Sequence, residues 1–265
     1  VGVGTGPFIN PAPSPGASPG SNPTDIVYWL NPEVGLDEMG QVWTNQAVGT
    51  PPAAATLQGT VSRTPIADRV NSYSMVQLGE DGFVDLPLQG DVGDFTFAVV
   101  FRSQFATATA TTEPWQEQPT LLGCSNDAAT DAAFGLAMLQ SGELIYAPTP
   151  ADDEIAFTSA TPVNGGDLHV LLVLRDQSAD NVSLILDGEL IADDVSALGG
   201  DITGTGALRL GAQVETMTGM LLRGEWEGDL GDVLYFSRIV QPTIKDTLST
   251  VLALKYGITF DTPTE

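Results

Sequence analysis

Short apolar runs, separated by turn residues, repeat along the chain from Asp25 onward. Gly, Asp and Asn bound these runs, and apolar and polar positions alternate within several of them, as in antiparallel strands with one face in a core. The run at 94–103 turns from alternating to continuously apolar, which is typical of a central strand. Strands are predicted at residues 26–30, 74–79, 82–88, 94–103, 120–125, 134–139, 143–147, 169–175, 182–187, 189–193, 207–213 and 226–238.

Three turn sequences indicate how neighbouring strands connect. Asp187-Gly188 predicts a type I′ hairpin turn between residues 182–187 and 189–193, because Gly accepts a positive φ. Gln140-Ser141-Gly142 predicts a tight turn before the strand at 143–147. Glu80-Asp81-Gly82 leads us to expect that the strands on either side of it pair with each other.

One amphipathic helix is predicted near the end of the sequence, in "PTIKDTLSTVLALKYGI". Pro242 suits its entrance, Thr243 with Asp246 resembles a capping box, and Gly257 is a suitable left-handed stop. Its buried face is expected to consist of Ile244, Leu248, Val251, Leu252 and Tyr256. Many short strands with one terminal helix, and no repeat of 20 to 50 residues, predict a two-sheet all-β sandwich.

The first 24 residues differ in composition from the rest of the chain. Their sequence is "VGVGTGPFINPAPSPGASPGSNPT". Such a Gly- and Pro-rich tract favours extended backbone and offers too little apolar surface to offset the entropy of ordering itself. We therefore divide the chain into an extended arm, 1–24, and a globular domain, 25–265. The arm is expected to lie on a neighbouring subunit through four apolar anchors, Val1, Val3, Phe8 and Ile9. The alternative is a plain linker.

The charge balance excludes two classes of partner. The 265 residues include 34 acidic and nine basic side chains, for a net charge of −25. Nucleic acids and anionic membranes need positive charge on the protein, so neither is expected as a partner. The acidic surface favours solubility or a salty habitat, where ions screen self-repulsion. No apolar run is long enough to span a membrane. We find no secretory signal pattern and leave export open.

Cys124 is the one cysteine and His169 the one histidine. An internal disulfide and a cysteine-based zinc site are therefore impossible, and Cys124 is expected to be a buried, inert thiol. His169 opens a strongly apolar strand, which favours a structural role over catalysis or metal binding.

Four stretches, in this order, resemble the laminin G-like branch of the concanavalin A-like lectin/glucanase superfamily. They are "VYWLNPEVG" with "GQVWTNQAVG", "VQLGEDGFVDLPL", "LHVLLVLRD…VSLILDGELIA" and "WEGDLGDVLYFSRIVQPTIKDTLSTVLALKYGI". The resemblance extends from Asp25 to Phe260 and implies a curved antiparallel jelly roll with Trp29, Trp43 and Trp226 in its core. Its ending is frequent in bacterial surface proteins and structural proteins of tailed viruses. It implies adhesion or assembly more than chemistry, although a fold does not fix a function.

Carboxylates offer two further hypotheses. Some relatives in this superfamily hydrolyse glycans with an E-x-D-x-x-E pattern, and Glu225, Glu227 and Asp229 approach it. Here, however, the third acid would be Asp232, an aspartate where the pattern has a glutamate, and the apolar neighbours Leu230, Val233 and Tyr235 suit an ordinary sandwich strand, so no enzymatic activity is expected. No cofactor is expected either, although calcium stays open because some laminin G-like domains bind it. Its candidate ligands are Asp152, Asp153, Asp193 and Asp194.

Trp115 lies in a long polar stretch between two strands, where an exposed indole can stack on a sugar or meet a neighbouring subunit. Folding back over the sheet is the alternative. We expect a non-enzymatic structural protein of a tailed-virus particle, a head decoration, fibre or tail component. It would assemble with other virion proteins and as a homo-oligomer, and contact host-surface glycans. The alternative is a carbohydrate-binding or adhesive module of a secreted or cell-surface protein.

Overall fold

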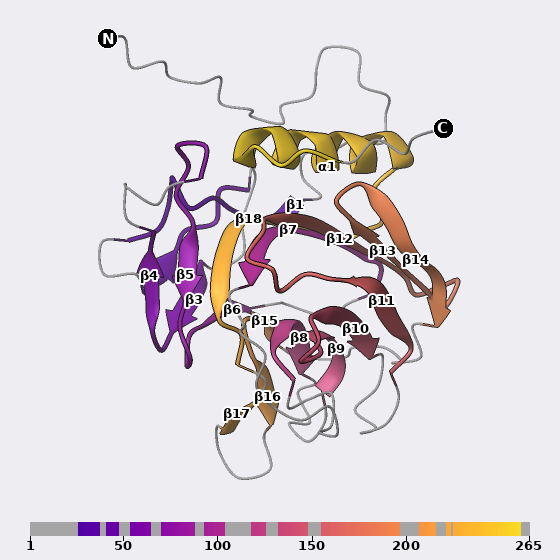
Figure 1. Ribbon diagram of the computed structural model, residues 1–265, viewed down its shortest axis with the longest axis horizontal. Coiled ribbons are helices and arrows are strands. Elements are labelled where there is room, and N and C mark those ends of the chain that lie inside the picture. The colour runs from indigo at the N-terminus through magenta and orange to yellow at the C-terminus, as the bar shows by residue number, and fades with distance from the viewer. Residues whose placement is uncertain are drawn as a thin grey trace.

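The computed structural model describes residues 26–37, 41–47, 54–64, 70–87, 93–103, 118–125, 132–147, 155–196, 207–215, 221–223 and 225–260. These residues form two large antiparallel sheets, packed face to face, and one helix that covers one of them (Figure 1). The predicted all-β jelly-roll sandwich with a C-terminal helix is confirmed. The arm at 1–24 lies outside the described residues, so its boundary with the domain stays a prediction.

The sheet beneath the helix, named the helix-side sheet, has the strand order β14-β13-β12-β7-β18-β5-β4, and β1 also pairs with β18. Its strands are β1 (Ile26–Leu30), β4 (Val61–Arg63), β5 (Val76–Leu78), β7 (Phe95–Ser103), β12 (His169–Asp176), β13 (Asn181–Leu186), β14 (Glu189–Ser196) and β18 (Gly228–Phe236).

The opposite sheet, named the far sheet, has the order β11-β10-β9-β8-β15-β6-β3-β2. Its strands are β2 (Val42–Trp43), β3 (Ala55–Gln58), β6 (Phe83–Pro87), β8 (Thr120–Ser125), β9 (Ala132–Met138), β10 (Glu143–Ala147), β11 (Phe157–Pro162) and β15 (Ala207–Leu210). A separate two-stranded ribbon consists of β16 (Gln213–Glu215) and β17 (Leu221–Arg223).

The central strand β7 separates two hydrophobic cores, and this explains its continuous apolar sequence. Phe97 and Phe101 face the core between the sheets. Ala98 and Val100, on the other face, belong to the core between the helix-side sheet and the helix. A strand with both faces covered needs apolar residues at every position, whereas a half-exposed strand alternates. β7 pairs with β12 and β18, as expected for a central strand.

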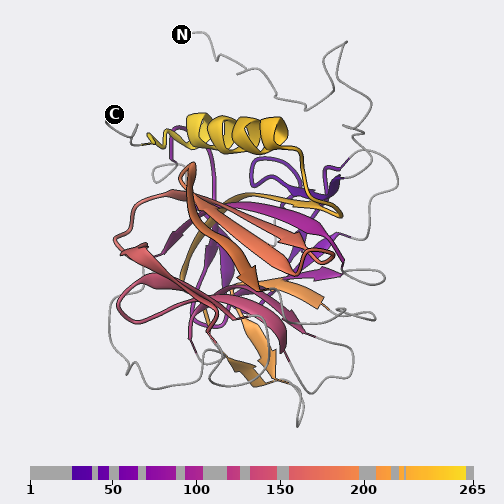
Figure 2. The same ribbon diagram turned by 90° about the vertical axis from the view of Figure 1, so that its right-hand side faces the viewer.

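Helix α1 (Pro242–Tyr256) lies along the helix-side sheet (Figure 2) and ends at Gly257, whose φ of 70° is the predicted left-handed stop. Leu252 and Tyr256 are buried as predicted. The predicted capping box is wrong: the N-cap is Gln241, without a side-chain hydrogen bond, and Thr243 lies inside the helix. Pro242 has no N–H that needs an acceptor, so the helix begins there, ahead of Thr243.

The expected hairpin around Glu80-Asp81-Gly82 is also wrong. β5 belongs to the helix-side sheet and β6 to the far sheet, so this turn carries the chain from one layer to the other. β3 and β4 cross between the layers beside it. Hydrogen bonds join the two crossings, from the Gly79 N–H to the Thr60 carbonyl (2.8 Å) and from the Thr60 N–H to Asp81 Oδ1 (2.7 Å).

The other two turns are as predicted. Asp187 and Gly188 both have positive φ, 51° and 83°, which is the signature of a type I′ turn between β13 and β14. Gly142, at φ 97°, closes the β9–β10 hairpin, and its N–H donates to the Leu139 carbonyl (2.8 Å).

The turn Trp43-Thr44-Asn45, in the first of the four stretches that carry the family resemblance, has a clear physical role. Asn45 is buried, and its Oδ1 accepts hydrogen bonds from the backbone N–H groups of Trp29 (2.9 Å) and Ala47 (3.0 Å). Its Nδ2 donates to the Val27 carbonyl (2.6 Å). One amide side chain therefore ties the loop after β2 to the first strand.

Candidate ligand-binding pocket

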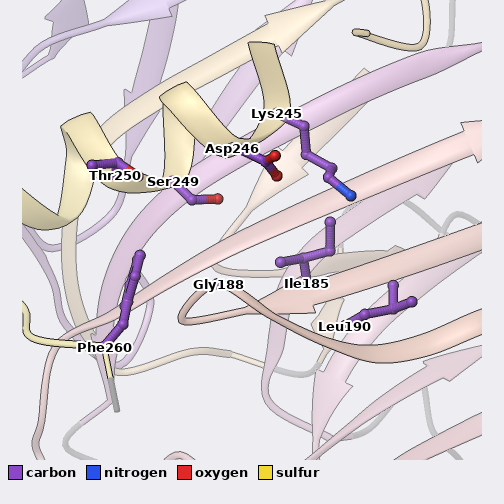
Figure 3. Close-up of a pocket in the computed structure, with 8 residues that line it drawn as sticks. All are labelled: Ile185, Gly188, Leu190, Lys245, Asp246, Ser249, Thr250 and Phe260. Atoms are coloured by element: carbon purple, nitrogen blue, oxygen red, sulfur yellow. The ribbon is translucent and has the colours of Figure 1, made fainter. Parts of the chain in front are cut away.

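A pocket with a volume of about 230 Å³ lies between α1 and the β13–β14 hairpin, and Figure 3 shows its lining. We name it the helix–hairpin pocket. The lining residues are Ile185, Gly188 and Leu190 from the hairpin, Lys245, Asp246, Ser249 and Thr250 from α1, and Phe260 after the helix. Drug-sized ligands occupy pockets of roughly 300–1,000 Å³. The helix–hairpin pocket therefore suits a ligand, or one unit of a longer ligand, of about monosaccharide size.

The apolar part of the pocket depends on the hairpin turn. Leu190 is 51% exposed, Ile185 is buried, and the half-buried Phe260 ring packs against Gly188 (Figure 3). A Cβ atom on Gly188 would lie 3.0 Å from Phe260 Cδ2, closer than side chains normally pack. Gly188 is thus needed twice, for the positive φ of the turn and for the approach of the ring.

His169 holds this turn in place. Its Nδ1 lies 2.7 Å from Asp187 Oδ2, and Asp187 Oδ1 accepts a hydrogen bond from the Val170 N–H (2.8 Å). The His169 ring also contacts Phe101, with the ring centroids 5.5 Å apart. The structural role expected for the one histidine is therefore confirmed, since His169 holds Asp187, the residue before the pocket-lining Gly188.

The polar part of the pocket is a single flank of α1. Lys245, Asp246, Ser249 and Thr250 follow an i, i+1, i+4, i+5 spacing, which places them side by side on the helix next to its sheet-facing stripe. Figure 3 shows Lys245 and Ser249 extending from α1 toward the hairpin side. Ser249 is only 4% exposed. Within the described residues, none of these four side chains has a hydrogen bond or ion pair with another residue.

Other polar groups beneath the helix have partners. Asp232 is buried, and it accepts hydrogen bonds from Tyr256 Oη (3.0 Å), Trp29 Nε1 (3.3 Å) and the Lys255 ammonium, with which it forms an ion pair. A β-bulge in β18 between Leu230 and Val233 coincides with this cluster. Burial and the adjacent Asp232 carboxylate raise the pKa of Tyr256. This cluster fastens α1 to the sheet, and its groups are already satisfied.

The acidic residues near the start of β18 do not form a catalytic pair in the described structure. Asp229 is buried in an ion pair with Arg102, whereas Glu227 is exposed. Burial and the nearby carboxylates of Glu80, Asp81 and Glu227 raise the pKa of Glu225. The E-x-D-x-x-E hypothesis therefore gains no support from the geometry.

The remaining candidates are placed only in part. Asp193 is exposed, and its Oδ1 accepts a hydrogen bond from Ser183 Oγ (2.7 Å). Within the described ranges, no group of three or more potential metal ligands comes together. Trp115, Asp152, Asp153 and the arm anchors Val1, Val3, Phe8 and Ile9 lie outside the described residues, as does the side chain of Asp194. Calcium binding, arm docking and a Trp115 contact thus stay predictions.

Three expectations for single residues can be checked. Cys124 is buried, as expected, and burial raises the pKa of its thiol to about 12, which disfavours the reactive thiolate. Trp43 and Trp226 are fully buried core residues. Trp29 is half-buried and belongs to the cluster beneath α1.

The described helix is too short to cross a membrane.

Sequence reasoning did not find the helix–hairpin pocket. The available signal was the second, polar stripe on α1 at Lys245, Asp246, Ser249 and Thr250, together with a phenylalanine just beyond the helix. That signal has no meaning until the neighbouring element is known. Only the fold shows that the β13–β14 hairpin lies beside this flank.

No protein-family model matches the chain, and no curated protein matches it. Solved structures do. The binding domain of Paraclostridial Mosquitocidal Protein 1 aligns with a TM-score of 0.59 and 11% identity, over 87% of this chain and 53% of the toxin domain. The binding domain of Botulinum Neurotoxin DC, in complex with SialylT, aligns with a TM-score of 0.58 and 11% identity, over 88% of this chain and 52% of that one.

Domain 4 of AbnA, a GH43 extracellular arabinanase from Geobacillus stearothermophilus, in complex with arabinotriose, aligns with a TM-score of 0.54 and 10% identity. This match covers 85% of our chain and 98% of the arabinanase domain. The chain thus spans about half the length of the toxin binding domains but nearly all of the arabinanase domain. At these identities the likeness shows the fold alone. The described domain therefore has the jelly-roll β-sandwich fold of these domains.

Proposed function

We propose that this chain is a carbohydrate-binding module and that the helix–hairpin pocket is its saccharide site. The observation that carries the proposal is the convergence of four unpartnered polar side chains on a small pocket with an aromatic wall. Ser249 is the least exposed of them, and its hydroxyl, which has no partner among the described residues, can donate a hydrogen bond to a ligand or accept one from it.

The chemistry of the pocket matches that of a sugar. A sugar ring has a C–H face that packs on apolar and aromatic side chains, and an edge of hydroxyl groups that donate and accept hydrogen bonds. Phe260 and Leu190 offer the apolar contact. Ser249 and Thr250 can donate or accept, and Asp246 can accept from a pair of hydroxyls.

The comparison with the arabinanase domain supports this proposal, because that domain has the same fold over nearly its whole length and is described with a bound arabinotriose. The toxin domains lend less support, since only about half of each is matched. The structural role in a virus particle that we expected from the sequence rested mainly on the arm, which lies outside the described residues. The described residues offer it no comparable site, so we favour carbohydrate binding.

The test is a glycan-array screen followed by calorimetric titration of the strongest saccharide. We expect wild-type binding, and about tenfold weaker binding for Phe260→Ala, since an aromatic contact contributes about 0.5–1.5 kcal/mol beyond its buried area. Leu254→Ala is the matched control, because Leu254 is 70% exposed on the same helix and does not line the pocket.

Ser249→Ala separates binding from folding. Alanine is the better helix former, so the variant should be at least as stable as wild type. Loss of one hydrogen bond should nevertheless weaken saccharide binding about two- to tenfold. Absence of any saccharide ligand, or equal affinities for wild type and both pocket variants, would refute the proposed function.

A further inference from the structure

Lys245 differs from the other described basic residues. Among the basic residues whose side chains the structure describes, each of the others has a partner inside the protein: Arg63, Arg102, Arg175, Arg209, Arg238 and Lys255. Lys245, in contrast, has no hydrogen bond or ion pair from its ammonium within the described part of the chain. It is half-buried, and it lines the helix–hairpin pocket (Figure 3).

An unpaired cation is unusual among the basic side chains that the structure describes. With 34 acidic and nine basic residues, the surface repels anions at long range. Asp246 lines the same pocket, yet it makes no ion pair with Lys245. The ammonium is therefore available to a ligand, and the group that it recognises best is an anionic oxygen acceptor.

We propose that the helix–hairpin pocket binds a sugar residue that carries a carboxylate, with Lys245 as the residue that selects it. This inference rests on the proposed carbohydrate-binding function. Lys245 pairs with the carboxylate, whereas Asp246, Ser249 and Thr250 serve the ring hydroxyls and Phe260 the apolar face of the ring. The Asp246 carboxylate repels the carboxylate of the sugar, whereas the Lys245 ammonium attracts it. The two charges together therefore orient the sugar with its carboxylate beside Lys245.

The experiment compares two probes that differ only in the carboxyl group. One is an oligogalacturonate, and the other is the same oligosaccharide after reduction of its carboxyl groups to neutral alcohols. Calorimetric titration should show that wild type binds the acidic probe about tenfold or more tightly than the neutral one. Lys245→Met should remove that preference, so that the variant binds the acidic and the neutral probe with affinities within about twofold of each other.

Arg63→Gln is the matched control. It also removes one positive charge, but from a partly exposed pair with Glu33 that does not line the pocket. The control should keep the wild-type preference. Screening provides a second measurement: the difference between wild type and Lys245→Met should shrink between about 20 mM and about 500 mM salt, because salt weakens the pairing of partly exposed charges.

The outcomes are distinguishable. If wild type binds both probes equally, or if Lys245→Met keeps the preference, the selection by Lys245 is refuted while carbohydrate binding stands. If neither these probes nor any array saccharide binds, the proposed function fails, and the inference fails with it.

Discussion

Replacing Asp232 by alanine tests how α1, and with it one wall of the pocket, is held on the sheet. Asp232 is the shared acceptor for Tyr256, Trp29 and Lys255, and it is 2% exposed. Its removal leaves Lys255, whose side chain is only 15% exposed, without this counter-ion, and leaves the Tyr256 and Trp29 donors without this acceptor.

The expected magnitude follows from these contacts. Removing one partner of a buried ion pair lowers the free energy of unfolding by about 3–5 kcal/mol, because the other charge stays buried and uncompensated. Each orphaned donor alone would cost about 1–3 kcal/mol, but the three losses share one site and do not add. We therefore expect Asp232→Ala to lower the free energy of unfolding by about 3–5 kcal/mol, a large part of the roughly 5–15 kcal/mol of a typical domain.

Equilibrium urea unfolding, followed by circular dichroism and tryptophan fluorescence, measures this change. Asp246→Ala is the control, since Asp246 is exposed on the same helix and has no partner among the described residues; its effect should stay within about 0.5 kcal/mol. Asp232→Ala combined with Lys255→Met should be more stable than the sum of the two single losses predicts. A loss below about 1 kcal/mol for Asp232→Ala would show that the cluster does not fasten the helix.

Three further outcomes are expected. Gly188→Ala should lower the free energy of unfolding by about 1–3 kcal/mol, because alanine is strained at φ 83° and its Cβ meets the neighbouring ring, and it should also weaken saccharide binding in a titration. Asn45→Ala should cost about 2–4 kcal/mol in urea unfolding through three lost hydrogen bonds, and a neutral effect would contradict the role given to the motif. Burial raises the pKa values of Tyr146, Tyr235 and Cys124, so the folded state holds these protons more tightly than the unfolded chain does. These three groups should leave the free energy of unfolding unchanged below about pH 8 and lower it above about pH 9–10 by about 1.4 kcal/mol per pH unit per group, and a flat profile between about pH 8 and pH 11 would refute this.

Much of the architecture was predictable because it depends on local patterns. The β13–β14 hairpin follows from Asp187-Gly188, since few residue pairs accept two positive φ values. β7 follows from its unbroken apolar run, which requires cover on both faces. The end of α1 at Gly257 follows from the same preference for positive φ.

The errors and omissions have a common physical cause. The sequence at Glu80-Asp81-Gly82 allows both a hairpin and a crossing between layers, and only the strand partners of β5 and β6 decide between them. The pocket likewise depends on two elements distant in sequence, the 185–190 hairpin and α1. Local propensity describes each element, whereas a site between elements depends on how the whole domain packs.

The most direct test of our account is an NMR titration of the isotope-labelled domain with an acidic trisaccharide. We expect the backbone amide shifts to change at the β13–β14 turn around Gly188, along α1 at Ser249 and Thr250, and at Phe260, with saturation at the affinity found by calorimetry. Shift changes confined to the far sheet, or no changes at saturating saccharide, would contradict the assignment of the helix–hairpin pocket as the binding site.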